Sequence, residues 1–482
     1  MNWNFPYRST RLPILAANCV ATTQPLAAQA GLQMLARGGN AVDAALAAAI
    51  ALTVVEPTMN GIGGDAFALV WDGHALHGLN ASGRAPRAWT SDRFADGPMP
   101  DVGWDSVTVP GGVSGWVALH EKFGRLPFED LFEPALRYAQ DGFLVPYAIS
   151  RIWQNQVQRL AGQPGFAEVF LPNGRAPLPG ERFRCPDQAR SLSLIARSMG
   201  EAFYSGELAE ALCAASAAEG GALVLADLRD HRCEWVEPIS TDYRGYSVHE
   251  IPPNGQGIAA LVALAVLEKL QPADFDPDSA EALHLQVEAV KVGLRDAEDH
   301  VAEPSCAVMT PAQLLDPARI DDLASRIDLK HASTATAAPR GSETVYLAAA
   351  DCDGMAVSFI QSNYKGFGSG VVVPGTGIAL HNRGVNFVTT VGHPNQVGPG
   401  KRPRHTILPG FITRGDKAVG PFGVMGGSMQ PQGQVQLVTR MLGAGQNPQA
   451  AIDAPRWRAE SGALWVEDAM TGEVRAGLEA LG

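Results

Sequence analysis

The chain has 482 residues, and its 50 acidic against 37 basic side chains give a formal net charge of −13. Because no stripe of lysine and arginine offsets this charge, the protein repels a phosphate backbone, and we expect no nucleic-acid partner. Only 18% of the residues are charged, and 52 glycines with 34 prolines predict many tight turns. This composition excludes a disordered or coiled-coil chain and favours a compact body.

Membrane spans, leader peptides and metal sites leave no signature in the sequence. The longest apolar stretch, residues 44–55, has 12 residues against the roughly 20 that span a bilayer, so it predicts a buried helix and no membrane contact. The first 13 residues include two prolines and no apolar core of a signal peptide, which favours a cytoplasmic location. The 6 cysteines and 11 histidines lack C-x-x-C and H-x-x-H spacings, which argues against disulfides and against a bound metal.

Helical patterns fill the first two-thirds of the chain, and strand patterns fill the last third. A proline opens the first helix, Gly38 ends it, and Asn40 then provides an N-cap for the alanine-rich segment that follows. The predicted helices cover residues 25–36, 44–55, 110–123, 128–141, 258–270, 280–300 and 434–442, and a first strand covers residues 67–71. This separation predicts an α+β fold of stacked helix and sheet layers rather than a parallel doubly wound sheet.

The composition changes at residues 331–343 (HASTATAAPRGSE), where small polar residues predict an exposed linker. Directly after it, the run VYLAAA, a turn at Asp353–Gly354 and the run MAVSFIQS predict a β-hairpin. In such a hairpin the chain returns so that Ser362 lies within about one residue of pairing with Thr344. Thr344 is the residue at which the predicted linker meets the predicted strand.

This position makes Thr344 a candidate nucleophile. A threonine hydroxyl is a weak nucleophile unless a base lies beside it, and a free N-terminal amine on the same residue, with a pKa near 7.7 to 8.0, is such a base. Cleavage of the chain before Thr344 creates that amine, and a hydroxyl at Ser362 would orient the threonine side chain. An ordinary threonine at the start of a strand is the alternative interpretation at this point.

Three glycine-rich stretches invite a nucleotide-binding interpretation. They are GIGGD (61–65), GFGSG (366–370) and GVMGG (423–427), and they match neither the dinucleotide fingerprint nor the P-loop. The sequence also contains no G-x-S-x-G nucleophile elbow. Judged alone, these stretches indicate tight turns and predict no nucleotide cofactor.

Several segments, taken in order, resemble the gamma-glutamyltranspeptidase family over nearly the whole chain. They are EPTMNGIGGDAFALVWDG (56–73), SGRAP (82–86), PPNGQGIAAL (252–261), ETVYLAAADCDGMAVSF (343–359), KRPRHTILP (401–409) and GVMGGS (423–428). The family implies an N-terminal-nucleophile (Ntn) hydrolase with a four-layer αββα sandwich, made as one chain that cleaves itself before a threonine. The resemblance implies no cofactor and no metal.

Carried over residue by residue, the resemblance assigns roles to positions of this chain. It implies Thr344 as the nucleophile, with Ser362 in place of the threonine that hydrogen-bonds it. It implies Arg84 as the residue that binds a substrate carboxylate. The backbone N–H groups of Gly426 and Gly427 would form the oxyanion hole.

The chain departs from the family at the positions that bind the glutamyl group. The family's Asn, Gln and Asp correspond here to Tyr364, Arg383 and Asn386, and its paired serines correspond to His405 and Thr406. The carboxylate that would neutralise a substrate α-ammonium is therefore missing, and an arginine is added. The pattern is similar to the branch with oxamate amidohydrolase and acylase-like members.

We therefore expect a self-processing Ntn amidohydrolase that acts on a small-molecule amide whose acyl group carries a carboxylate, with water or an amine as acceptor. Cleavage between Glu343 and Thr344 would give a large chain, 1–343, and a small chain, 344–482, whose early end suggests truncation. The two chains would form one intertwined structural domain, with a homodimer left open.

Two alternatives remain from the sequence. One is gamma-glutamyl transfer or hydrolysis of glutathione-like donors, which needs a partner for the α-ammonium that the matched positions do not supply. The other is a catalytically silent scaffold of the same fold, against which the intact Thr344, Ser362, Gly426 and Gly427 argue.

Overall fold

A computed structural model describes residues 6–7, 11–334 and 343–482 of the chain. Two antiparallel sheets dominate it, one of six strands in the order β1-β9-β10-β2-β3-β6 and one of four in the order β14-β13-β8-β7. The central part of the predicted linker, residues 335–342, lies outside the described residues. The predicted α+β class is confirmed.

The first sheet joins strands from both ends of the chain. β9 and β10 form the predicted hairpin, and β10 also pairs along its whole length with β2. Gly354 in the hairpin turn has a φ of +94°, which glycine adopts without strain. The strands are β1 (Cys19–Thr22), β2 (Asp65–Trp71), β3 (Leu76–Ala81), β6 (Glu234–Val236), β9 (Val345–Ala350) and β10 (Ala356–Ser362).

The second sheet is also built from both parts of the chain. Its strands are β7 (Ile239–Tyr243), β8 (Tyr246–Glu250), β13 (Gly410–Arg414) and β14 (Lys417–Phe422). The strand predicted over 67–71 is β2, but the prediction that strands otherwise belong to the last third is wrong, because β1, β3, β6, β7 and β8 also precede it. β14 contacts β10, so the two sheets face each other.

Three short strand pairs lie outside the sheets: β4 (Phe143–Leu144) with β5 (Arg182–Phe183), β11 (Val372–Val373) with β12 (Ile378–Ala379), and β15 (Trp457–Glu460) with β16 (Ala463–Val466).

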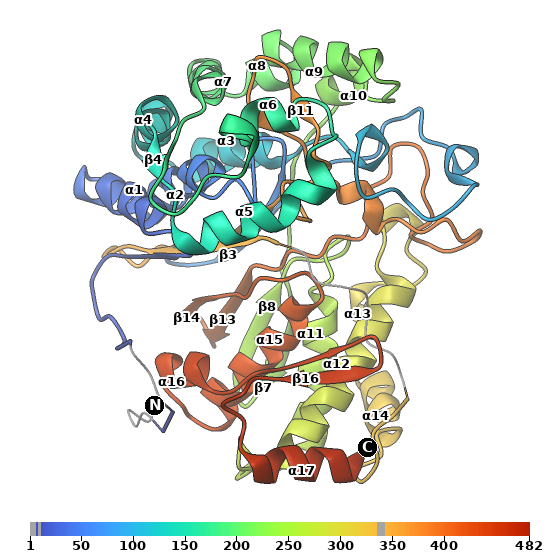
Figure 1. Ribbon diagram of the computed structural model, residues 1–482. Helices are drawn as coiled ribbons and strands as arrows, with labels where there is room; N and C mark the ends of the chain where they lie inside the picture. Colours follow the sequence, from blue (N-terminus) through green and yellow to red (C-terminus); the bar gives the residue numbers. More distant parts are fainter. Residues whose placement is uncertain (1–5, 8–10, 335–342) are drawn as a thin grey trace.

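Helices pack on the outer side of each sheet (Figure 1). The upper group contains α1 (Pro25–Ala36), α2 (Ala41–Val55), α3 (Gly112–Phe123), α4 (Glu133–Asp141), α5 (Tyr147–Leu160), α6 (Phe166–Phe170), α7 (Pro186–Arg197), α8 (Glu201–Tyr204), α9 (Glu207–Ala218) and α10 (Leu225–Arg229). The lower group contains α11 (Ile258–Leu270), α12 (Ala280–His300), α13 (Pro311–Leu314), α14 (Pro317–Ser325), α15 (Met429–Val438), α16 (Pro448–Asp453) and α17 (Gly472–Leu481). α2 contacts β9 and β10, and α11 contacts β7 and β8.

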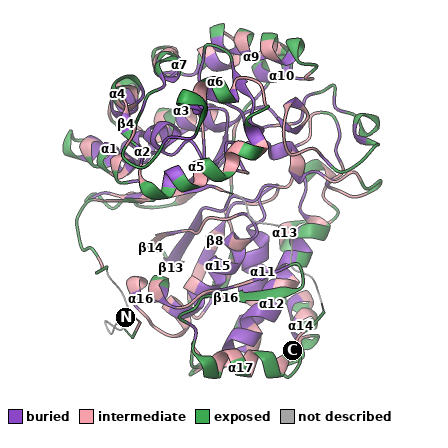
Figure 2. Cartoon of the chain, in the orientation of Figure 1, coloured by how far each residue is buried: buried purple, intermediate pink, exposed green. Residues whose placement is uncertain are grey.

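Helix α2 is buried on all sides (Figure 2). It packs between α1, α4 and the strands β9 and β10, which is why an apolar residue suits every face. The Asn40 side chain accepts from the N–H groups of Val42 and Asp43, and Asp43 accepts from the N–H of Asn40. This reciprocal capping box starts the helix, and the predicted N-cap is confirmed.

Helix bounds were predicted well where the pattern is regular. The helices expected over 258–270 and 280–300 are α11 and α12 with the same bounds. The helix expected over 128–141 is instead a 3-10 turn followed by α4, because Pro134 has no N–H to continue the ladder. The helix expected over 434–442 begins earlier, at Met429, and continues as a π-turn over Thr439–Gly443. In the described ranges, no helix is both long and apolar enough to cross a membrane.

Glu56 is a buried carboxyl group at the end of α2. It is 2% exposed, and its Oε2 accepts a hydrogen bond from Thr23 Oγ1 at 2.5 Å. Burial raises the pKa of Glu56 from its ordinary value of 4.5 to about 7, while the hydrogen bond from Thr23 opposes this rise. Glu56 also precedes the glycine-rich loop 57–64 that leads into β2.

Replacing Glu56 by glutamine should remove a pH-dependent part of the stability. Because the folded carboxyl has a pKa of about 7 rather than 4.5, its contribution is complete below pH 4.5 and is lost as the pH rises through 7. The difference between the folded pKa of about 7 and the ordinary value of 4.5 corresponds to roughly 3 kcal/mol of unfolding free energy. In urea denaturation, the free energy of unfolding of Glu56→Gln relative to that of wild type should rise by this amount between pH 4.5 and pH 8. Glu210→Gln, at an exposed position of α9, should not, and equal curves for Glu56→Gln and wild type would contradict the argument.

Candidate active site

One row of side chains crosses three neighbouring strands at the end of the first sheet. In the pairing of β9 with β10, Val345 lies opposite Gln361, so the next step along the ladder sets Thr344 against Ser362. In the pairing of β10 with β2, Ser362 lies opposite Asp65. Directly opposed residues project from the same face of an antiparallel sheet, so Thr344, Ser362 and Asp65 share one face.

The hydroxyl groups of Thr344 and Ser362 are in contact, as the predicted hairpin requires. Thr344 Oγ1 lies 3.2 Å from Ser362 Oγ and 2.7 Å from the carbonyl oxygen of Glu343. Ser362 Oγ donates to the same carbonyl oxygen at 2.9 Å and accepts from the N–H of Tyr364 at 2.7 Å. Two hydroxyl groups therefore converge on the carbonyl that precedes Thr344, in a place where Thr344 is only 1% exposed.

The side chain of Glu343 is held beside helix α5. Gln156 Nε2 donates to Glu343 Oε1 at 3.4 Å, and Arg159 donates to Gln156 Oε1 and to the carbonyl oxygen of Gly366. Burial raises the pKa of Glu343, while the N–H of Gly366 and the charge of Arg159 oppose this rise. The residue on the carbonyl side of the predicted cleavage bond is therefore anchored through its side chain.

Arg383 is a fully buried cation with unused hydrogen-bond donors. Its Nη1 donates to Thr406 Oγ1 at 2.9 Å, and its Cζ lies 4.6 Å from the centre of the Tyr364 ring, within cation–π distance. Within the described residues, Arg383 Nε and Nη2 and Asn386 Nδ2 have no acceptor. Arg383 and Asn386 begin and end one 3-10 turn, in which side chains three residues apart project to the same side.

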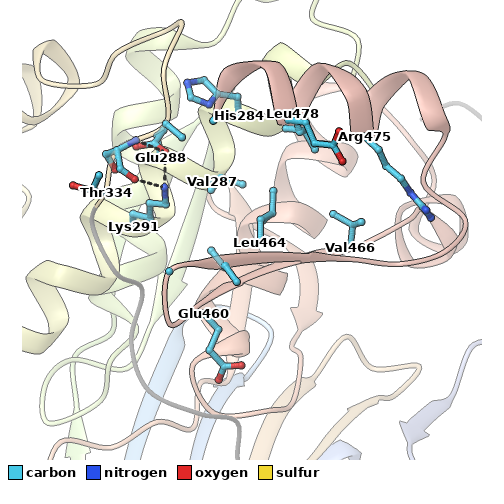
Figure 3. A pocket seen from close by; sticks show the side chains of 17 residues that line it. His284, Val287, Glu288, Lys291, Thr334, Glu460, Leu464, Val466, Arg475 and Leu478 are labelled. Atoms are coloured by element: carbon cyan, nitrogen blue, oxygen red, sulfur yellow. Dashed lines mark hydrogen bonds and ion pairs between the residues drawn. The ribbon is translucent and has the colours of Figure 1, made fainter.

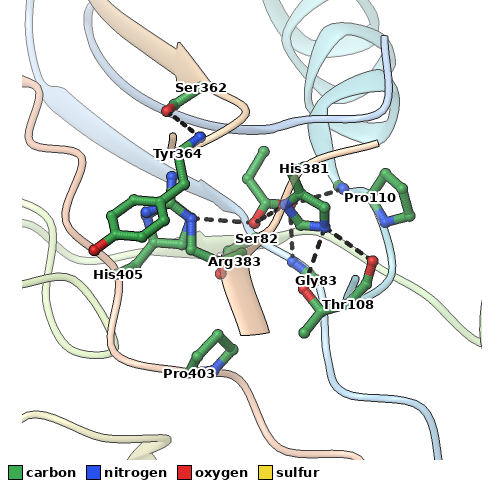
Figure 4. Close-up of polar contacts among 12 residues, drawn as sticks. Ser82, Gly83, Thr108, Pro110, Ser362, Tyr364, His381, Arg383, Pro403 and His405 are labelled. Carbon is green, nitrogen blue, oxygen red and sulfur yellow. Dashed lines mark hydrogen bonds and ion pairs between the residues drawn. The ribbon is translucent and has the colours of Figure 1, made fainter. Parts of the chain in front are cut away.

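Asp65 is a fully buried carboxylate in the same cluster. Figure 4 shows His381, Arg383 and His405 close together in this cluster. Its Oδ1 accepts from the N–H groups of Gly111 at 2.9 Å and Gly83 at 3.2 Å. Its Oδ2 lies 3.1 Å from His405 Nε2 and 3.4 Å from His381 Nδ1. Burial alone would raise the pKa of Asp65, but His381 and His405 hold that pKa well below its usual range.

The charges in this cluster follow from these contacts. Burial and the positive charge of Arg383 lower the pKa of His405 to about 3, so its ring is neutral at pH 7 and donates through Nε2 to Asp65. Burial lowers the pKa of Arg383 to about 10, and the negative charge of Asp65 opposes this change. Arg383 and Asp65 are thus buried charges of opposite sign at neutral pH.

Gly426 and Gly427 form the turn that precedes α15. Their φ angles are +109° and +58°, values that favour glycine. Gln256 Nε2 donates to the carbonyl oxygens of Thr406 and Gly427, which ties this turn to the cluster around Arg383. Across the described ranges, neither glycine N–H donates to a backbone carbonyl outside helices and strands, which is compatible with oxyanion donors. Their role in catalysis stays a prediction.

Arg84 is not brought into this cluster. Its guanidinium forms ion pairs with Glu234 at 3.1 Å and Glu303 at 2.9 Å, and it donates to the carbonyl oxygen of Gly400. Two carboxylates therefore already balance its charge, and in the part of the chain that the structure describes no hydrogen bond or ion pair joins it to Thr344. The predicted role of Arg84 in binding a substrate carboxylate stays untested.

A cavity of about 500 Å³ lies at a different place, between α12, β16 and α17 (Figure 3). Its walls combine the apolar side chains of Val287, Leu464 and Leu478 with an ion pair of Glu288 and Lys291. None of the predicted site residues lines it. Among the residues that the structure describes, no group of three or more His, Cys, Asp or Glu side chains could hold a metal ion.

Asp65 and His381 were missed as site residues from the sequence. A signal for Asp65 existed, because it ends the GIGGD stretch just before the predicted strand 67–71, where a carboxylate among apolar residues is unusual. His381 offered no such signal, since it reaches Asp65 from the loop after β12.

Comparison with known proteins finds relatives over nearly the whole chain. The gamma-glutamyltranspeptidase family profile matches residues 27–482. The chain is 41% identical to the glutathione hydrolase-like YwrD proenzyme of Bacillus subtilis (strain 168), over 91% of this chain and 84% of that protein. It is 39% identical to the oxamate amidohydrolase proenzyme of Klebsiella pneumoniae subsp. pneumoniae, over 90% of this chain and 83% of that protein.

A solved structure extends this similarity to the whole fold. The cephalosporin acylase from Bacillus halodurans superposes with a TM-score of 0.95 at 46% identity, over 100% of this chain and 91% of that chain. The match therefore includes both sheets and the helices outside them. The chain belongs to the gamma-glutamyltranspeptidase family of enzymes.

Proposed function

We propose that this protein is a self-processing amidohydrolase in which Thr344 is the nucleophile both for cleaving its own chain and for turning over substrate. The observation that carries the proposal is the convergence of the Thr344 and Ser362 hydroxyls on the Glu343 carbonyl oxygen, at 2.7 and 2.9 Å. Helices outside two facing sheets support a four-layer αββα sandwich of the Ntn-hydrolase type. The names of two relatives as proenzymes agree with maturation by cleavage.

In the cleavage step, Thr344 Oγ1 attacks the carbonyl carbon of Glu343, and the amide becomes an ester on that oxygen. The proton of the Thr344 hydroxyl passes to the departing amine nitrogen. The Ser362 hydroxyl donates to the carbonyl oxygen while negative charge develops there. Water then hydrolyses the ester, which leaves a carboxylate on Glu343 and a free amine and hydroxyl on Thr344.

In the mature enzyme, the α-amine of Thr344 is the general base, since an unperturbed α-amine has a pKa near 7.7 to 8.0. It accepts the hydroxyl proton as Oγ1 attacks the substrate amide and then delivers that proton to the leaving amine. The N–H groups of Gly426 and Gly427 bind the oxyanion. Water or another amine then releases the acyl group from Thr344.

The acyl donor in this proposal carries a carboxylate and no ammonium group. Arg383 supports this choice, because its Nε and Nη2 are buried donors that find no acceptor among the described residues, and a carboxylate would pair with both. Asn386 Nδ2 is a further donor on the same turn. A gamma-glutamyl donor would bring an α-ammonium toward a buried guanidinium, with like-charge repulsion and uncompensated desolvation. An oxamate-like donor or a dicarboxylic monoamide avoids both costs.

Processing should yield two chains, residues 1–343 and 344–482. Dividing the mass of 50.9 kDa by residue count gives chains of about 36 and 15 kDa. Because cleavage has to expose the amine of Thr344, N-terminal sequencing of the small chain should begin with TVYLA. An uncut single band from active enzyme, or a different new N-terminus, would contradict the proposal.

Removing the two hydroxyl groups should have graded effects. Thr344→Ala should abolish both chain cleavage and amide hydrolysis. Ser362→Ala should slow both by about 5- to 150-fold, the equivalent of the 1 to 3 kcal/mol that a lost buried hydrogen bond costs. The rate of precursor loss on denaturing gels measures chain cleavage, and the initial rate of hydrolysis measures turnover of the substrate.

Ser358→Ala is the matched control for Ser362→Ala. Ser358 is also a buried serine of β10, but its hydroxyl contacts Tyr346 and the carbonyl of Phe422 rather than the nucleophile. Ser358→Ala should leave both rates near the wild-type values. Equal losses in the two serine variants would indicate a general packing defect instead of an orienting hydroxyl.

The preferred acyl donor should be the one whose carboxylate accepts hydrogen bonds from Arg383. We expect kcat/KM for oxamate or a dicarboxylic monoamide to exceed that for gamma-glutamyl amides by at least about 10-fold, or about 1.4 kcal/mol. Arg383→Gln combined with Asn386→Asp, which restores the family's residues, should narrow this gap. A preference of the unmodified enzyme for gamma-glutamyl donors would refute the argument from charge.

A further inference from the structure

We propose that Asp65 is a positioning residue of this site: it fixes His405 and Arg383 so that the free donors of the guanidinium face the acyl carboxylate. Asp65 does this without touching the substrate. The inference rests on the proposed function, and it assigns a role to a residue outside the positions matched to the family's substrate-binding residues.

Asp65 is already surrounded by protein groups. Oδ1 accepts from the N–H groups of Gly83 and Gly111, and Oδ2 faces the ring nitrogens of His381 and His405. Hydrogen bonds take three of the roughly four acceptor directions of the carboxylate, and His381 Nδ1 lies 3.4 Å from Oδ2. Asp65 is also 0% exposed. It is therefore unsuited to bind a substrate ammonium, although it is a buried carboxylate in the right cluster.

Asp65 reaches Arg383 by two routes. Along the chain, His405 donates to Asp65, and its neighbour Thr406 accepts from Arg383 Nη1, so the carboxylate restrains the segment that holds the guanidinium. Through space, the negative charge of Asp65 stabilises the charged guanidinium. Arg383 has no ion-pair partner within 4.0 Å among the described residues, so Asp65 and the face of Tyr364 provide its compensation.

The strand register then links this charge pair to the nucleophile. Asp65 lies opposite Ser362, and Ser362 lies opposite Thr344 in the continued ladder, so three adjacent strands carry the three side chains. Asp65 thus stands in the same row as the nucleophile and restrains Arg383 through His405 and Thr406. A purely structural role for Asp65 would stabilise the fold but would not determine which acyl groups are accepted.

The test compares two donors that differ in one negative charge and one methyl group. The probes are the mono-p-nitroanilide of a dicarboxylic acid and the methyl ester of the same compound. The ratio of kcat/KM for the acid to that for the ester does not depend on how much enzyme is folded. Asp65→Asn keeps the size of the side chain but places an NH2 group where acceptors are needed. We expect the ratio to fall at least about 10-fold in this variant.

Asp72→Asn is the matched control. Asp72 follows the other end of β2, and it accepts from two backbone N–H groups and pairs with His77 Nε2 at 2.8 Å, as Asp65 does with its own partners. It lies about 23 Å from Asp65 along the strand. The ratio should stay at the wild-type value in this variant. A fall as large as that of Asp65→Asn would overturn the proposal.

A double-mutant cycle tests whether Asp65 acts through Arg383. In the Arg383→Gln background, Asp65→Asn should cause no further fall in the ratio, because the group that it positions is gone. An equal fall in both backgrounds would overturn the inference. If Asp65→Asn yields no folded enzyme, His405→Leu breaks the same contact from the other side and should lower the ratio similarly. An unchanged ratio in His405→Leu would overturn the inference.

The outcomes separate this inference from the proposed function. If wild-type enzyme shows no preference for the acid over the ester, the proposal of a carboxylate-bearing donor fails, and the role of Asp65 fails with it. If wild type prefers the acid and Asp65→Asn retains that preference, only the role of Asp65 is overturned.

Discussion

The register of β9, β10 and β2 is the constraint on which the site depends. A slip of one residue between β9 and β10 would turn Thr344 to the face opposite Ser362. Val345 and Leu347 resist such a slip because they are buried in the core under α2, while Tyr346 faces the cluster between the two sheets. The alternating hydrophobic pattern of the hairpin therefore sets the geometry of the hydroxyl groups as well as the stability of the sheet.

The two buried charges are satisfied unequally, and this inequality has chemical consequences. Moving a carboxylate and a guanidinium out of water is favourable only with good geometry and with hydrogen bonds for the remaining polar atoms. Backbone N–H groups and histidine rings surround Asp65, whereas two donors of Arg383 lack an acceptor in the described structure. The protein thus completes the coordination of its anion and leaves that of its cation incomplete, which creates an electrostatic preference for an anionic ligand.

Local patterns account for what could be predicted from the sequence. Helices α11 and α12 have regular periodicity, and the turn at Asp353–Gly354 defines the hairpin, so the contact of Thr344 with Ser362 follows from sequence alone. Strands β3 and β8 escaped prediction because polar residues break their alternation, although each pairs with the strand just before it, β2 and β7. The contact of Asp65 with His405 joins residues 340 positions apart, and nothing near either residue indicates it.

The same sheet explains how a chain end could serve as a nucleophile. Terminal residues of a chain normally fray, and a mobile Thr344 would lose the alignment of its hydroxyl. In this fold β9 lies between β1 and β10, and β10 pairs with β2, so ladders from the large chain flank both strands of the hairpin. None of these ladders includes the bond between residues 343 and 344. Cleavage there would free an amine while the sheet continues to hold the residue that bears it.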